Sequence, residues 1–232
     1  DLELMEKYAT KQPYGEWLDN NLVQLHDLKI PNKKVPVHTK EERARLQKAF
    51  GYTYEDFKTS ILPMALNGSE QIGAMGIDTP LAVLSNNHQP LFNYFKQLFA
   101  QVTNPPIDSI REKVVTSTTV YLGSDGNVLE EKPENCKQLR INNPILTNTD
   151  ILKIKNMKVD GFKVETIPII YYKNTSLEKA IDHLYVEADR AHREGANIII
   201  LSDRGVDENH VAIPSLLAVS ALQQYLVQTR SE

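Results

Sequence analysis

The feature that most constrains the fold is the run 162–203, in which a strand, a helix and a second strand follow one another. Its first segment, FKVETIPIIYY, is β-branched and apolar, and NIIILSD at its end is almost wholly apolar. Between the two segments, six residues at helical spacing predict one buried face: Leu177, Ala180, Ile181, Leu184, Ala188 and Ala191. A helical crossover between two buried strands is typical of a parallel sheet.

Local signals also predict the ends of this helix. Thr175, with Glu178 three residues later, predicts a capping box at the start, and Gly195 predicts the end. Asp203 and Arg204 follow the second strand, at the carboxyl end where α/β proteins place their sites. They are secondary site candidates, and the alternative interpretation is an Asp203–Arg204 pair that only fixes the loop.

The rest of the chain predicts an irregular helical N-terminal part and a strand-rich middle. Residues 39–51 and 53–66 each open with a threonine and an acidic residue three positions later, which is a helix-start signal, and Pro63 is expected to interrupt the second helix. Six apolar residues within 91–102 predict a core helix, stopped by Asn104-Pro105-Pro106. Segments 114–123 and 137–146 predict strands on either side of a turn at Asp125-Gly126.

Composition excludes several classes of protein. With 232 residues, 41% of them hydrophobic, the chain can form one α/β domain over residues 1–232. A net charge of -4 argues against a nucleic-acid partner, and no apolar run approaches a membrane span of about 20 residues. Cys136 is the only cysteine, so an internal disulfide and a cysteine-based metal or iron–sulfur site are excluded, which fits a reducing cytosol. The start, DLELMEKYATK, is that of a piece of a longer polypeptide or of a processed chain.

No complete active site can be assembled from the residues alone. The glycine-rich segment GSEQIGAMG (68–76) lacks the Lys-Ser/Thr of a phosphate loop and does not follow a strand. The histidines are scattered without a ligand-like spacing, and no serine-elbow motif is present. Physical chemistry therefore predicts a fold, with catalytic, cofactor-binding and metal-binding residues all absent.

Several long motifs, in order along the chain, carry a resemblance. PYGEWL (13–18), MGIDTPLAVLS (75–85), FNYFKQLFAQVTNPPIDSIRE (92–112), NPILTN (143–148) and IIILSDRG with IPSLLAVSAL (198–222) closely resemble the central domain of the large subunit of glutamate synthase. These motifs cover nearly the whole chain. The resemblance implies a fragment without the amidotransferase and FMN/iron–sulfur domains of that enzyme.

The resemblance implies a parent oxidoreductase of nitrogen assimilation that makes two glutamates from glutamine and 2-oxoglutarate in the cytoplasm. Ammonia released in an amidotransferase domain passes through a tunnel to a domain holding FMN and a 3Fe-4S cluster. The central domain links these two domains of the same polypeptide, and its expected fold is a degenerate, incomplete TIM-barrel-like domain with parallel βαβ units. No cofactor is expected in this chain, and the electron donor of the parent stays open between NADPH and ferredoxin.

Site residues follow from the same resemblance. The loop GAMGIDTP places Gly76, Asp78, Thr79 and Pro80 near the amidotransferase junction and the tunnel entrance, and Asn104 and Arg111 belong to the same motif set. The alternative function is a stand-alone degenerate-barrel enzyme or binding module with its site around Asp203 and Arg204.

Overall fold

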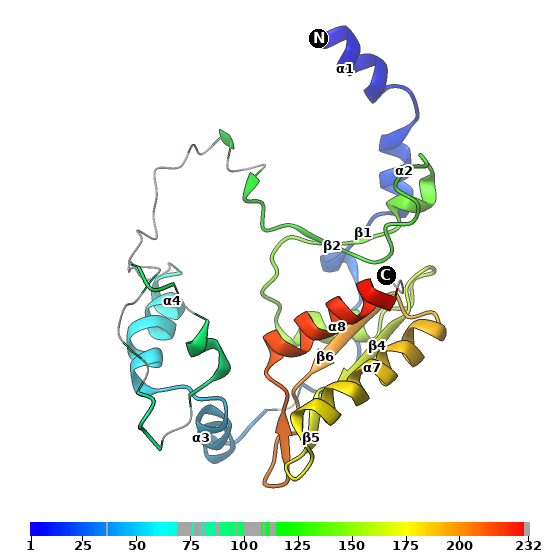
Figure 1. The fold of residues 1–232 in the computed structure, drawn as a ribbon. Helices are drawn as coiled ribbons and strands as arrows, with labels where there is room; N and C mark the ends of the chain where they lie inside the picture. The colour runs from blue at the N-terminus through cyan, green and yellow to red at the C-terminus, as the bar shows by residue number, and fades with distance from the viewer. Residues whose placement is uncertain are drawn as a thin grey trace. The chain divides into compact units, whose positions relative to one another are not determined.

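The chain divides into two compact units, which are described separately. The computed structural model describes residues 1–35, 37–68, 76, 80, 82–86, 89–95, 97–99, 108, 110–111 and 115–229. The first unit comprises Asp1–Val35 and Thr118–Glu232, and the second comprises Pro36–Ser117. Figure 1 colours the chain from blue at the N-terminus to red at the C-terminus.

A parallel βαβ crossover forms the centre of the first unit, as predicted. Strand β4 (Val164–Pro168) pairs in parallel with β6 (Ile198–Ser202), and helix α7 (Leu177–Arg193) lies between them in sequence (Figure 1). The predicted apolar face is confirmed, since four of its residues are buried and the other two pack against them. Helix α8 (Ser215–Thr229) contributes Ala218 and Leu222 to the same core.

The two ends of α7 differ in how well they match the prediction. Gly195 adopts φ +89°, and Gly195 and Ala196 donate their N–H groups to the carbonyls of His192 and Ala191, which is the Schellman arrangement. At the start the prediction is wrong by one residue. Ser176 is the N-cap and accepts from the Lys179 N–H, whereas the preceding threonine belongs to the turn before the helix.

The predicted strand 162–172 is two strands that pair differently. After β4, strand β5 (Ile170–Tyr172) pairs antiparallel with β7 (His210–Ala212), which the sequence did not predict. Ile169 lies between the two ladders. Its N–H donates to the Ser202 carbonyl at 2.9 Å, and its own carbonyl accepts from the Ile213 N–H at 2.8 Å.

A second core lies beneath a three-stranded sheet of order β1-β3-β2. Strand β1 (Val23–Gln24) runs parallel to β3 (Leu139–Ile141), and β2 (Val120–Leu122) runs antiparallel to it. The predicted antiparallel pairing of the two segments is thus confirmed, but the strands are shorter. The predicted tight turn at Asp125-Gly126 is wrong, because a longer connection that contains the 3-10 turn η4 (Pro133–Cys136) joins the strands. Leu139 and Ile141 are buried against Ile154 of helix α6 (Asn148–Lys155).

The remaining elements of the first unit precede this sheet. They are α1 (Leu2–Ala9), α2 (Tyr14–Asn21) and the 3-10 turn η1 (Leu25–Asp27). Among the described residues, the sheets contain at most three strands and do not close into a barrel. The mixed α/β class with a parallel βαβ unit is confirmed by the pairing of β4 with β6 on either side of α7.

The second unit begins with helices whose starts the sequence predicts. Helix α3 (Lys40–Ala49) opens with the full Thr39–Glu42 capping box and ends before Gly51. The π-helical segment η2 (Asp56–Ile61) leads directly into α4 (Leu62–Asn67), so Pro63 does not break the helix. A wider turn before Pro63 leaves room for a residue that lacks the N–H of a regular α-helical bond.

The prediction of a core helix over 91–102 is wrong in the part that the structure describes. Only a 3-10 turn, η3 (Leu91–Tyr94), forms there, and Phe95 follows with φ -112° and ψ 70°. Phe95 and Phe99 are 73% and 66% exposed. Helical spacing identified the apolar residues, but the described residues neither form the helix nor bury these two side chains.

Helix α6 makes stability depend on pH through its cap. Thr147 and Asp150 form a capping box, and the hydrogen bonds from the Thr147 side chain and backbone hold the pKa of Asp150 below its ordinary value. A depressed carboxyl pKa stabilises the fold above the unfolded-state value of about 4, and this contribution is lost as pH falls through the folded-state pKa. Replacing Asp150→Asn should therefore cost about 1 kcal/mol at pH 7 and less at pH 3.

Urea unfolding of the two proteins at both pH values checks this expectation. Asp19→Asn is the matched control, because Asp19 is exposed on α2 and its side chain makes no hydrogen bond within the described residues. A difference between wild type and Asp150→Asn that does not shrink on acidification would contradict the role of the cap.

Candidate functional site

The residues predicted at the domain junction all belong to the second unit. Asp78, Thr79 and Asn104 lie outside the described residues, whereas Gly76, Pro80 and Arg111 lie within them. The secondary candidates Asp203 and Arg204 belong to the first unit. The two groups of candidates are therefore in different units.

Gly76 lies against the backbone of another segment. A Cβ atom at this position would lie 1.8 Å from the carbonyl oxygen of Phe99 and 3.1 Å from that of Gln97, so no larger residue fits without a backbone shift. Arg111 is fixed at its backbone instead. The Asp108 carboxylate accepts from the N–H groups of Ile110 and Arg111, at 2.9 and 3.3 Å.

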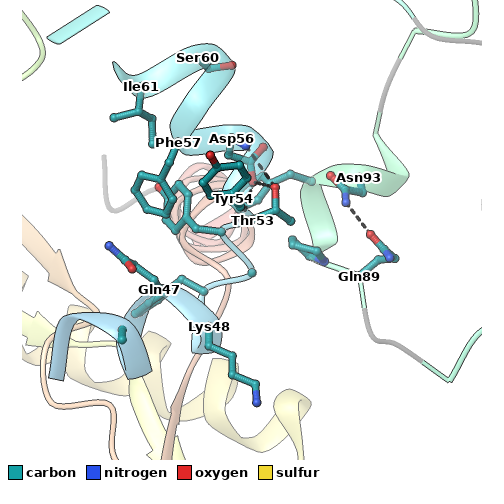
Figure 2. A pocket seen from close by; sticks show the side chains of 16 residues that line it. Gln47, Lys48, Thr53, Tyr54, Asp56, Phe57, Ser60, Ile61, Gln89 and Asn93 are labelled. Carbon is teal, nitrogen blue, oxygen red and sulfur yellow. Dashed lines mark hydrogen bonds between the residues drawn. The ribbon is translucent and has the colours of Figure 1, made fainter. Parts of the chain in front are cut away.

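The second unit also contains a pocket of about 950 Å³, shown in Figure 2. Its wall combines the last turns of α3, the segment 51–61 and the segment 89–93. The lining residues are Ala44, Gln47, Lys48, Phe50, Gly51, Tyr52, Thr53, Tyr54, Asp56, Phe57, Ser60, Ile61, Gln89, Pro90, Phe92 and Asn93. Aromatic rings thus provide much of the surface, with amides and hydroxyls between them.

A close approach at Gly51 brings two of these segments together. Gly51 has φ +76°, and a Cβ atom there would lie 2.5 Å from Cγ of Pro90. Both the left-handed backbone and the contact require glycine. This residue therefore places the end of α3 against the segment that starts η3.

Polar side chains of the pocket are paired with one another. Thr53 donates its N–H and its hydroxyl to the Asp56 carboxylate at 2.7 and 2.8 Å, and Asn93 donates to Gln89 at 2.8 Å (Figure 2). The rings of Tyr52 and Phe57 lie 5.7 Å apart, tilted by 40°. The Asp56 carboxylate therefore accepts two hydrogen bonds that cap the start of the helix.

The pocket lining carries few of the side chains that catalysis commonly uses. Its lining has no histidine or cysteine, and Asp56 is already held by the helix cap. The hydroxyl–carboxylate pair observed in the wall, Thr53 with Asp56, is the pair that caps this helix. Within the described ranges, no group of His, Cys, Asp and Glu side chains could hold a metal ion.

At the carboxyl end of β6 the structure separates the two candidate residues. Arg204 donates from Nη2 to Oδ1 of Asn148, the first residue of α6, at 2.6 Å. No ion pair joins Asp203 to Arg204 among the described residues, so the alternative interpretation of such a pair is wrong, and Arg204 bonds to Asn148. The observed bond ties the loop after β6 to a neighbouring helix.

Sequence reasoning missed the pocket, although one signal for it was present. Phe50, Tyr52, Tyr54 and Phe57 fall within eight residues, on either side of the helix-start signal at Thr53. The contribution of 89–93 had no comparable signal, because it depends on a long-range contact.

A comparison with models of protein families shows which family the chain belongs to. The family model described as glutamate synthase central domain matches residues 45–232. The chain belongs to the glutamate synthase central domain family. The match runs through both units and includes the pocket, apart from Ala44.

Curated relatives agree with this family. The chain is 41% identical to the large chain of NADPH glutamate synthase from Bacillus subtilis, over 98% of its own length and 15% of the relative. It is 38% identical to NADH glutamate synthase from Schizosaccharomyces pombe, over 99% of the chain and 12% of the relative. Against ferredoxin-dependent glutamate synthase 2 from Synechocystis, identity is 38% over 97% of the chain and 15% of the relative.

The chain therefore spans 12–15% of the length of these glutamate synthases. It is similar to one domain of a larger polypeptide, and relatives named for NADPH, NADH and ferredoxin share it about equally. Among the helices that the structure describes, none combines the length and the apolar character needed to cross a membrane.

Proposed function

We propose that this chain links the amidotransferase domain to the FMN-binding domain of a glutamate synthase and forms part of the wall of its ammonia tunnel. Glutamine and 2-oxoglutarate would be the substrates of the whole polypeptide, and two glutamates its products. Catalysis would occur in the neighbouring domains, because the pocket and the β6 end lack a complete catalytic set.

The observation that carries this proposal is the exposure of apolar side chains in the second unit. Among its described residues none is buried, and many large apolar side chains are at least 39% exposed. They include Phe50, Tyr52, Tyr54, Leu62, Met64, Leu66, Phe92, Tyr94, Phe95, Leu98 and Phe99. Removing apolar surface from water contributes about 25 cal/mol per Å², so a surface of this kind favours coverage by other domains.

The finer features of the proposal rest on the resemblance and on the family match. We propose that residues 1–232 act as one domain, because the match continues from one unit into the other. The β4-α7-β6 unit supports a distant relation to a (β/α)8 barrel. FMN and a 3Fe-4S cluster would be held by the following domain, and the polypeptide would act in the cytoplasm.

Within this function, the loop around Gly76 would form the tunnel wall. A conduit for neutral ammonia needs ordered, water-poor walls, since contact with water allows protonation and loss. The tight contact of Gly76 with the Phe99 carbonyl supports a compact, backbone-lined segment. Asp78, Thr79 and Pro80 would continue this wall, with Asn104 and Arg111 as further junction residues.

Substitution of the tunnel residues in the full-length enzyme tests this role. Thr79→Val and Asp78→Asn should raise the glutamine hydrolysed per glutamate formed, because ammonia escapes before it reaches the second site. The measurement is the ratio of ammonia release to glutamate synthesis under saturating glutamine. Asp19→Asn serves as the control, and an unchanged ratio in both tunnel variants would refute the tunnel role.

A further inference from the structure

A row of three polar side chains crosses the outer face of the β1-β3-β2 sheet. In the sheet register, Arg140 of β3 is paired with Gln24 of β1 and with Tyr121 of β2. Directly opposed residues project to the same face of a sheet, and adjacent residues project to opposite faces. Because Leu139 and Ile141 enter the core, the Gln24–Arg140–Tyr121 row lies on the face away from that core.

Arg140 is held in place without a partner for its charge. Its Nε is enclosed and makes no hydrogen bond, and within the described residues no carboxylate lies within 4.0 Å of its guanidinium. The two terminal nitrogens are not enclosed in this way. Because Nε is enclosed and the terminal nitrogens are accessible, the guanidinium is partly dehydrated and restricted in orientation.

Other arginines in the described part of the chain differ from Arg140. Arg190 pairs with Glu187, and Arg204 bonds to Asn148. Arg193 makes no hydrogen bond or ion pair with the described residues and is exposed on the last turn of α7, where water solvates its charge. Arg140 alone among these combines partial burial with an unpaired guanidinium.

The donors of the row match a carboxylate. A guanidinium binds both oxygens of a carboxylate through two parallel N–H groups, and these charge-assisted bonds are stronger than neutral ones. The Gln24 amide and the Tyr121 hydroxyl flank it and offer further donors. Neither side chain forms a hydrogen bond within the described residues, so both are available.

We infer that Arg140 is the anchor for an aspartate or glutamate side chain contributed by another part of the same long polypeptide. The inference rests on the proposed linking function, because the chain spans only 12–15% of the relatives and the remainder would provide the partner. The three-stranded sheet then presents a polar contact on the first unit, distinct from the apolar surface of the second.

Carbodiimide cross-linking of the full-length protein tests this site directly. In Arg140→Lys, the amine of the new side chain would form an amide bond with the contacting carboxylate, with loss of water to the carbodiimide. Peptide mass spectrometry should then find position 140 joined to an aspartate or glutamate outside residues 1–232. The control Arg193→Lys should not give that cross-link.

A second measurement tests the same contact without the lysine variant, in case that variant does not fold or does not react. In wild-type protein the partner carboxylate should resist modification by carbodiimide and glycinamide, and Arg140→Gln should make it reactive. A cross-link only to residues within 1–232, or only to isotopically labelled glutamate added in solution, would overturn the inference. If that result came with normal ammonia coupling, the linking function would stand and only the carboxylate anchor would fall.

Discussion

Replacing Leu184→Ala is expected to lower the free energy of unfolding by about 2–5 kcal/mol. Leu184 is 2% exposed in the middle of α7 and belongs to the core that this helix forms with β4, β6 and α8. Truncation removes the transfer free energy of the side chain and leaves a cavity, which neighbouring alanines cannot fill. Urea denaturation monitored by circular dichroism gives the change.

Val186→Ala is the matched control on the same helix. Val186 is 60% exposed, two residues from Leu184, so its truncation should change stability by less than about 0.5 kcal/mol. Equal effects of the two substitutions would mean that α7 does not pack through the predicted face.

Gly51→Ala is the second substitution with a large expected effect, and it acts on the pocket. Alanine at φ +76° costs about 1–2 kcal/mol, and its Cβ would clash with Cγ of Pro90, which lies 2.5 Å from that position. We expect segment 53–61 to lose protection from hydrogen exchange by ~30-fold, for a local destabilisation of about 2 kcal/mol. Exchange followed by mass spectrometry resolves this segment.

Gly68→Ala separates the clash from the backbone strain. Gly68 has φ +62°, but a Cβ there would meet no atom within 4 Å among the described residues. Its substitution should therefore leave exchange of segment 53–61 close to wild type. If both variants behaved alike, the contact between Gly51 and Pro90 would not be what holds the pocket together.

Local signals explain which parts of the fold could be predicted. The Thr39 capping box, the Gly195 helix end and the apolar face of α7 each depend on residues within a few positions of one another. The N-cap of α7 was misplaced by one residue because Thr175 and Ser176 both carry a hydroxyl, and only the turn geometry chooses between them. Pairing of β5 with β7 has no local signal, since 38 residues separate its paired ends.

Long-range packing explains most of the remaining misses. The periodicity of 91–102 identifies apolar residues on one face but does not say what covers them, and Phe95 and Phe99 remain exposed. Both segment 51–61 and segment 89–93 line the pocket, although they are far apart in the sequence. Arg140 lies beside Gln24 and Tyr121 only because the three strands pair in this register. Resemblance predicted the family, which composition and spacing alone could not do.

Ile169 has a mechanical consequence for the first unit. It follows the last pair of the parallel β4–β6 ladder and precedes the first pair of the antiparallel β5–β7 ladder, and its bonds to Ser202 and Ile213 join the two. A displacement of β7 would therefore reach β6 through the backbone of one buried residue, whose N–H and carbonyl belong to two successive peptide units. Under the proposed linking function, this shared residue would couple the two sheets whenever a neighbouring domain displaces either of them.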